Sequence, residues 1–251
     1  MIEHLDNSTG RVLKKLDELG LRDNTVVIFY SDNGGCISEN PYPEYMEGQV
    51  GGHMNMIMSS KRHYIPDSPL QYISTSNLPL RDEKGAVYEG GIREPLMVRW
   101  PGEIAAGQLS HVPVTTPDFY VTLLELARAP RPSEQVLDGI SLLPVLLNQS
   151  SDEERAIFWH YPVFHHGFPA AAVRKGDWKL IKNWMDGSLQ LFNLRMDLGE
   201  QTDLEASFPE KRDELHGLLS RWLEEVGAEL PVTNPDFDPK RRHEWGTHPD
   251  R

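Results

Sequence analysis

In the first two-thirds of this 251-residue sequence, two segments predict buried β-strands: the unbroken apolar run Val26–Tyr30 and the mainly apolar run Leu96–Trp100. A run without polar alternation is typical of a strand covered on both faces, as in a parallel sheet. A helix is expected over residues 2–19, and another is expected with Thr116 as its N-cap and Pro117 as its first helical residue, continuing to Ala127. This order predicts an α/β fold. Because two strands cannot form a doubly covered sheet, we expect the later part of a larger α/β domain.

The pattern changes after residue 150. Four short strand candidates, separated by turn residues, lie at 156–161, 170–173, 178–181 and 189–194. Short connections of this kind favour antiparallel hairpins. A helix with one apolar stripe is expected over about 209–226. We therefore expect three parts: residues 1–150 as part of the α/β domain, 151–230 as a small antiparallel-sheet subdomain with a packed helix, and 231–251 as an extended or mobile tail.

Composition excludes several classes of function. With 25 Lys and Arg against 38 Asp and Glu, the formal charge is −13, which argues against a protein that follows nucleic-acid phosphates. No apolar stretch approaches the roughly 20 residues that a membrane-spanning helix needs. The first residues have neither the basic start nor the apolar core of a signal peptide. The one cysteine, Cys36, excludes an internal disulfide.

A polar loop, Ser31-Asp32-Asn33-Gly34-Gly35, follows the first apolar run. Ligands of α/β sheets bind outside the carboxyl ends of strands. The Asp32 carboxylate and the Asn33 amide oxygen are hard ligands suited to Ca²⁺ or Mg²⁺. The same residue types also end strands in ordinary turns, so these residues alone leave both interpretations open.

A second loop, residues 81–95, combines glycines with charged side chains just before the second apolar run. Lys84 can supply positive charge to an anionic group. Arg93 can either bind an anion or pair with Glu89. A solvated loop with a surface ion pair is the alternative interpretation of this segment.

Taken together and in order, these segments resemble the sulfatase family of the alkaline-phosphatase superfamily. The matching text is Leu21–Gly35 (LRDNTVVIFYSDNGG), Lys84-Gly85, Tyr88–Pro95 (YEGGIREP) and Arg99–Gly102 (RWPG). Three later segments, Phe158–Pro162, Gly176–Ile181 and Leu191–Leu194, are similar to the C-terminal subdomain of bacterial arylsulfatase-like enzymes. The resemblance covers about residues 1–236. It implies the later part of an alkaline-phosphatase-like sheet domain, with mixed or parallel strands, followed by the small antiparallel subdomain.

The resemblance also implies roles for particular residues. Asp32 and Asn33 match two ligands of a catalytic Ca²⁺, with Mg²⁺ as the alternative cation. Lys84 matches a catalytic lysine that contacts the sulfate near its leaving oxygen. An Asp-Asn pair favours a sulfate ester, because phosphate-cleaving relatives more often carry a histidine beside the aspartate. The expected activity is hydrolysis of a sulfated carbohydrate or an aryl sulfate.

The family's nucleophile is not found in this sequence. Sulfatases convert the cysteine of Cys-x-Pro-x-Arg to formylglycine, whereas Cys36–Asn40 reads CISEN and lacks the proline and the arginine. The paired aspartates that precede the metal loop in the family are also absent. We therefore expect a fragment, roughly the C-terminal half of a sulfatase, that is inactive as an isolated chain. A phosphodiester or phosphonate hydrolase of the same superfamily and a non-catalytic relative remain alternatives.

Candidate substrate-binding residues lie in the C-terminal part. His160, His165 and Arg174 are expected to line the pocket for the rest of the substrate, although histidines exposed on a turn are an equal alternative. Because the chain is acidic, a small or polymeric sulfate ester must meet a local basic patch, with Arg174, Lys175 and Lys179 as candidates. The resemblance implies a periplasmic or secreted protein. Oligomeric state does not follow from the sequence.

Overall fold

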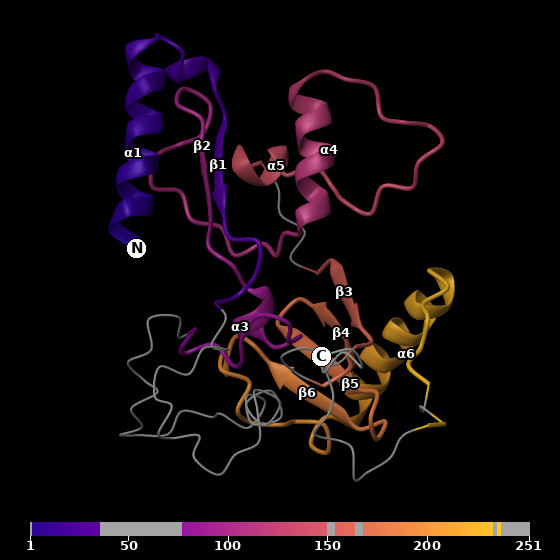
Figure 1. Cartoon of the computed structure of the whole chain (residues 1–251). Coiled ribbons are helices and arrows are strands. Elements are labelled where there is room, and N and C mark those ends of the chain that lie inside the picture. The colour runs from indigo at the N-terminus through magenta and orange to yellow at the C-terminus, as the bar shows by residue number, and fades with distance from the viewer. Residues whose placement is uncertain (1, 36–76, 150–153, 164–167, 233–234, 237–251) are drawn as a thin grey trace. The chain divides into compact units, whose positions relative to one another are not determined.

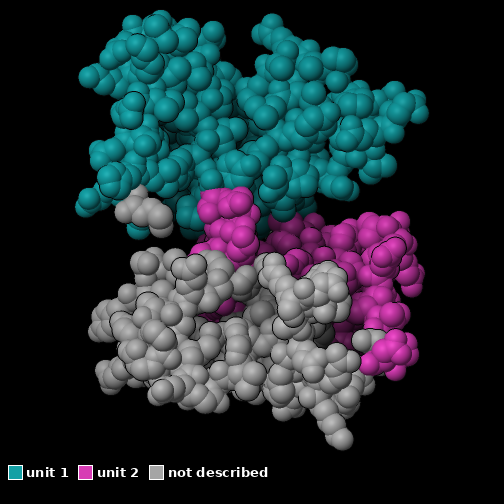
Figure 2. Space-filling model, viewed as in Figure 1, with its two compact units in different colours: residues 1–30, 95–155 teal, residues 31–94, 156–251 magenta. Residues whose placement is uncertain are grey.

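The structure is a computed structural model that describes residues 2–35, 77–149, 154–163, 168–232 and 235–236 (Figure 1). Expectations for Cys36, His165 and most of the tail therefore lie outside the described residues. The chain forms two compact units, which Figure 2 colours separately. Unit 1 consists of residues 1–30 and 95–155, and unit 2 of residues 31–94 and 156–251. The expected boundaries at residues 150 and 230 stay a prediction.

Unit 1 contains helices around a two-stranded sheet. Its elements are α1 (Ile2–Glu18), the 3₁₀ helix η1 (Arg22–Asn24), β1 (Val27–Tyr30), β2 (Leu96–Arg99), α4 (Thr116–Leu126) and α5 (Leu143–Leu146). Strands β1 and β2 pair antiparallel, with Val27 opposite Arg99 and Tyr30 opposite Leu96. Val27–Phe29 are half-buried and Tyr30 is exposed. The expectation of parallel-type strands covered on both faces is wrong for this pair, because an apolar run favours a strand without specifying its direction.

The helices of unit 1 form where the sequence predicts them. Helix α1 ends just before Gly20, whose φ of +66° suits a residue without a side chain. Helix α4 begins one residue earlier than expected, with Thr115 as its N-cap. The Thr115 amide donates to Asp118 Oδ2 at 2.7 Å, which satisfies a backbone group that the helix leaves unpaired.

Unit 2 is built on a four-stranded antiparallel sheet, as expected. Its strands, in spatial and sequence order, are β3 (Ala156–Tyr161), β4 (Ala170–Lys175), β5 (Trp178–Asn183) and β6 (Leu189–Asn193). Helix α6 (Pro209–Glu225) packs against β4 and β5 (Figure 1). Short turns after Lys175 and Asn183 join β4 to β5 and β5 to β6, which explains the antiparallel order of these strands.

The two faces of this sheet bury different partners. Alternate residues such as Val173 and Leu180 face α6, where they pack with Leu215 and Leu219. The other face packs against residues 86–88, in a core made of Ala86, Val87, Tyr88, Ala170, Ala172, Ile181, Phe192 and Leu194. The loop that precedes the short helix α3 (Glu89–Ile92) is thereby fixed to the sheet. Across the described residues, no helix is both long and apolar enough to span a membrane.

Candidate functional site

The predicted metal-binding loop lies at the start of unit 2. Asp32 is exposed, and Asn33 is half-buried. The Ser31 hydroxyl donates to the Asn33 carbonyl at 3.0 Å, and Asn33 Nδ2 donates to the Gly34 carbonyl at 3.1 Å. Because the amide nitrogen of Asn33 is used in this way, its Oδ1 is the atom that can accept a cation.

Backbone contacts join this loop to the loop that carries Lys84. The Gly34 amide donates to the Gly91 carbonyl at 3.3 Å, and the Lys84 amide donates to the Gly35 carbonyl at 3.3 Å. A Cβ atom at Gly34 would lie 1.8 Å from the Gly90 carbonyl oxygen, so only glycine permits this approach. The structure therefore brings together the backbones of the segments that carry Asp32, Asn33 and Lys84, whose side-chain roles stay predictions.

Asn77 is a residue of this site that the sequence analysis missed. Its Oδ1 accepts from the Gly35 amide at 3.0 Å, and its Nδ2 donates to the Gly35 carbonyl at 3.1 Å. The same nitrogen donates to the Asp82 carbonyl at 3.2 Å. Asn77 thus bridges the two loops. Asparagine is common in any turn, and Asn77 stands two residues before Pro79, so the sequence around it holds no signal for this role.

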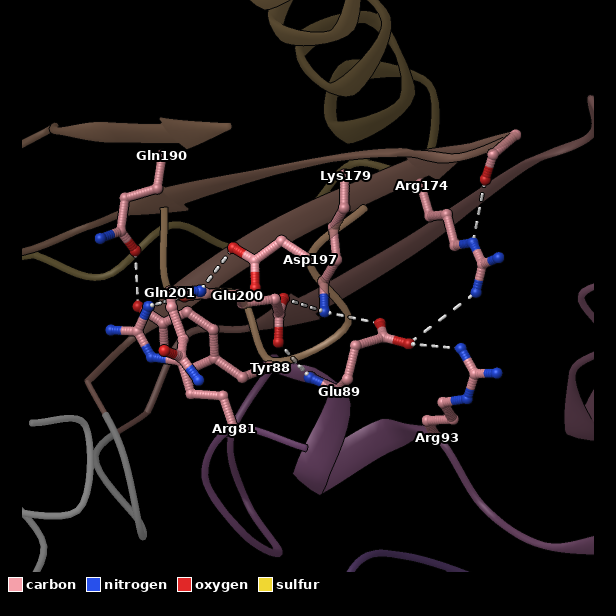
Figure 3. A network of polar contacts seen from close by, with 11 residues as sticks. Arg81, Tyr88, Glu89, Arg93, Arg174, Lys179, Gln190, Asp197, Glu200 and Gln201 are labelled. Carbon is pink, nitrogen blue, oxygen red and sulfur yellow. Dashed lines mark hydrogen bonds and ion pairs between the residues drawn. The ribbon is translucent and has the colours of Figure 1, made fainter. Parts of the chain in front are cut away.

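A buried network of charged side chains joins the sheet subdomain to the start of α3 (Figure 3). Lys179 on β5 is fully buried, and its Nζ lies 2.9 Å from Glu89 Oε1 and 2.8 Å from Glu200 Oε1. Glu200 Oε2 accepts from the Glu89 amide at 2.7 Å. The expectation that Lys179 belongs to a surface basic patch is wrong, because its side chain points into the sheet core and is used by two carboxylates.

Two arginines complete the surroundings of Glu89. Arg93 Nη1 lies 3.5 Å from Glu89 Oε2, and Arg174 Nη1 lies 3.9 Å from the same atom. Of the two alternatives for Arg93, the structure shows the pair with Glu89. Arg174 also donates from Nε to the Gly176 carbonyl at 3.1 Å. Its proposed contact with substrate stays a prediction.

The pKa values of the two carboxyl groups in this network are shifted in opposite directions. Burial acts to raise the pKa of Glu89, but Lys179, Arg174 and Arg93 outweigh it, so the pKa is lowered and Glu89 is held ionised. Burial raises the pKa of Glu200, and the nearby charge of Glu89 adds to this, while Lys179 acts against it. Lys179 contacts both carboxyl groups, whereas Arg93 and Arg174 add their positive charge at Glu89.

Two substrate-binding candidates remain, the histidines at positions 160 and 165, and the structure describes the first of them. His160 Nε2 lies 2.8 Å from the Glu229 carbonyl oxygen, and its ring meets Trp184 edge-on with centroids 5.9 Å apart. These contacts fix the imidazole within the sheet subdomain. His165 lies outside the described residues. The substrate-binding roles of both histidines stay predictions.

The Asp32 carboxylate oxygens and the Asn33 amide oxygen are of the type that hard cations such as Ca²⁺ prefer as ligands. Burial raises the pKa of the Glu94 carboxyl, the Ser31 hydrogen bond acts against this, and the negative charge of Asp32 raises it further. A cation at Asp32 would relieve that repulsion. In the part of the chain that the structure describes, no cluster of three or more His, Cys, Asp or Glu side chains could hold a metal. Because Ca²⁺ takes six to eight oxygens, Asp32 and Asn33 by themselves would supply only part of a ligand set.

The sequence matches two known families. Residues 1–129 match the family described as Sulfatase, and residues 82–227 match the one described as N-sulphoglucosamine sulphohydrolase, C-terminal. A sulfatase of Formosa agariphila is 33% identical over an alignment of 247 positions that covers 88% of this chain and 38% of that protein. N-acetylgalactosamine-6-sulfatase of Rattus norvegicus is 34% identical over 71% of this chain and 27% of its own length.

Solved structures show the same likeness. BT4656 in complex with its substrate D-glucosamine-2-N,6-O-disulfate has a TM-score of 0.65 at 25% identity, covering 90% of this chain and 39% of that one. Ps i-CgsB in complex with k-i-k-neocarrahexaose has a TM-score of 0.67 at 25% identity, covering 88% and 41%. The chain thus spans less than half the length of these relatives and has their α/β fold. On this agreement of sequence and structure, the chain belongs to the sulfatase family.

Proposed function

We propose that the chain forms part of a Ca²⁺-dependent sulfuric ester hydrolase that acts on a sulfated carbohydrate or an aryl sulfate. The observation that carries this proposal is the pair of backbone hydrogen bonds that join the Asp32–Asn33 loop to the Lys84 loop. The matched relatives include N-acetylgalactosamine-6-sulfatase and a structure with a disulfated glucosamine, which supports sulfated sugars as the substrate class. They favour sulfate over the phosphodiester or phosphonate alternative.

Each residue of the site has a chemical task in this proposal. Asp32 and Asn33 contribute two oxygen ligands to Ca²⁺, with Mg²⁺ as the alternative cation. The bound cation supplies Lewis-acid polarisation of the sulfate oxygens. Lys84 places a positive charge where negative charge develops on the leaving oxygen. The glycines beside these residues bring the two loops together without intervening side chains.

The rest of the substrate would contact the sheet subdomain. We assign His160, His165 and Arg174 to this role, with donors for sugar hydroxyl or sulfate groups. Arg174 is held by Glu89 and Gly176, so it presents a fixed guanidinium rather than a mobile one. The formylglycine nucleophile would come from a segment outside this sequence, because the residues after Cys36 do not form its motif.

Calcium titration of the purified chain tests the metal assignment. The amide resonances of Asp32 and Asn33 should shift with a dissociation constant of about 10⁻³ M or weaker, because the chain supplies only part of a ligand set. Asp32→Asn should abolish the response. Asp23→Asn, which changes another exposed aspartate, should leave it unchanged. Shifts that avoid the loop, or a response that survives Asp32→Asn, would refute the assignment.

A further inference from the structure

We propose that Glu200, Lys179 and Glu89 are positioning residues that hold the Asp32–Asn33 loop and the Lys84 loop in one arrangement. In the proposed function, these three residues touch neither metal nor substrate. The inference rests on that function only in assigning metal and sulfate binding to the two loops that they hold. Each step from Glu200 to the loops is a contact between described residues of unit 2, and Figure 3 shows the contacts around Glu200, Lys179 and Glu89.

The first step runs from the sheet subdomain to the start of α3. Glu200 accepts from the Glu89 amide through Oε2, and its backbone carbonyl accepts from Arg81 Nη1 at 2.8 Å. Lys179, which is fixed on β5, bridges the two carboxylates. One residue of the C-terminal subdomain therefore contacts both ends of the segment 81–89, which contains Lys84.

The second step runs from that segment to the metal-binding loop. The Gly90 amide donates to the Arg81 carbonyl at 2.7 Å, which closes the segment on itself. Gly91 then accepts from the Gly34 amide, and Gly90 lies against Gly34 without room for a side chain. A displacement of Glu89 would consequently move the surface on which Gly34 and its neighbours Asp32 and Asn33 rest.

The free-energy cost of burying these charged groups indicates that the network does more than fill space in the core. Burying two carboxylates and an ammonium stabilises a fold no better than apolar side chains of similar volume. Glu200 also has a φ of +51°, a conformation that residues other than glycine and asparagine rarely adopt. Apolar residues could fill the same space, but they could not accept from the Glu89 amide. The network adds a hydrogen bond to the Glu89 amide, and this bond fixes the position of the backbone there.

Amide hydrogen exchange tests this inference without metal or substrate. Glu200→Gly keeps the backbone conformation of the turn and removes the carboxylate, and Glu200→Gln keeps the size and one acceptor. We expect exchange at Gly34, Lys84 and Gly90 to become about tenfold faster or more in Glu200→Gly, and less so in Glu200→Gln. Exchange at Val173 and Leu180, in the sheet core, should change much less.

Glu205 provides the matched control. It forms an ion pair with Arg212 at 2.7 Å outside this network, so Glu205→Gly and Glu205→Gln should leave exchange at the two loops unchanged. Equal acceleration in the loops and the sheet core, or none in the loops, would overturn the inference. If Glu200→Gly unfolds the chain, the same comparison is read from Glu200→Gln.

Calcium titration of the same variants separates this inference from the proposed function. If both hold, Glu200→Gly weakens the calcium response of Asp32 and Asn33 although neither ligand is altered. If the unsubstituted chain shows no calcium response but its loops still loosen in Glu200→Gly, the metal assignment fails and the positioning network stands. A full calcium response in Glu200→Gly would contradict the network's role in the site.

Discussion

The contacts that assemble the candidate site are made by backbone atoms and by side chains with no expected part in chemistry. Gly34 and Gly90 approach too closely for any side chain, and Asn77 holds both polar groups of Gly35. Such contacts fix the backbone while leaving the side chains of Asp32 and Lys84 available. The site therefore depends on these residues as much as on its expected ligands.

Substitution of Asn77 measures this dependence directly. Asn77→Ala removes the acceptor for the Gly35 amide and both donated bonds, which should cost about 1–3 kcal/mol of local stability. Asn77→Asp keeps the acceptor and loses the donors, so Gly35 should be protected better than in Asn77→Ala. Amide exchange at Gly35 is the measurement. Equal exchange in Asn77→Ala and the unsubstituted chain would show that Asn77 does not hold the loop.

The predictability of the site differs from residue to residue. Asp32, Asn33 and Lys84 stand in recognisable local motifs, so the sequence singles them out, although their roles remain to be tested. Lys179 and Glu200 contact residues 90 and 111 positions away in the chain. No local pattern distinguishes such a lysine from one on a solvated strand, and for this reason Lys179 was wrongly expected at the surface.

At the scale of elements, short-range signals were sufficient for the positions of elements and for the antiparallel sheet of unit 2, but not for the pairing of strands far apart in the chain. Strand β3 and helix α6 lie within a residue of their expected bounds, because turns, proline and apolar periodicity act over a few residues. The antiparallel pairing of β1 with β2 was not predicted. Their residues are 66 or more positions apart, between Tyr30 and Leu96, and pairing at that distance depends on tertiary contacts.

Helix α4 depends on one buried carboxylate. Asp118 accepts from the Thr115 and Ile140 amides and from two nitrogens of Arg155, each of the latter at 2.8 Å. Burial acts to raise the pKa of Asp118, but these hydrogen bonds outweigh it and the pKa is lowered. Asp118→Ala would leave the Arg155 guanidinium without its partner, and we expect a loss of about 3 kcal/mol.

The same carboxylate predicts how the stability of α4 changes with pH. Since the folded pKa lies below the unfolded value near 4, the contribution of Asp118 is complete above about pH 4 and is lost as the pH falls through the folded pKa. The difference in stability between the unsubstituted chain and Asp118→Ala should therefore shrink below pH 4. Urea denaturation followed by the amide peaks of α4 measures it. A difference that is constant from pH 7 to pH 2 would contradict this assignment.

At the scale of the whole molecule, the chain holds a folded subdomain and the candidate functional site. Unit 2 buries a continuous core on both faces of its sheet, so it has the contacts needed for a stable fold. The chain spans 38% of the length of its Formosa agariphila relative. Its sequence includes two expected oxygen ligands and one expected sulfate-binding lysine, but no Cys-x-Pro-x-Arg.

These facts predict that the isolated chain folds but does not turn over substrate. Lys84 and a weakly held cation stabilise negative charge that develops only when a nucleophile attacks the sulfate, and this sequence lacks the nucleophile motif. We therefore expect no hydrolysis of 4-nitrophenyl sulfate above background in the presence of Ca²⁺. The release of 4-nitrophenol is the measurement, and 4-nitrophenyl phosphate tests the phosphate alternative in the same assay. Sulfate hydrolysis that is lost in Lys84→Ala would place a complete catalytic centre within these 251 residues and refute the prediction. Hydrolysis that survives that substitution would indicate a contaminating enzyme, or a centre that does not use Lys84.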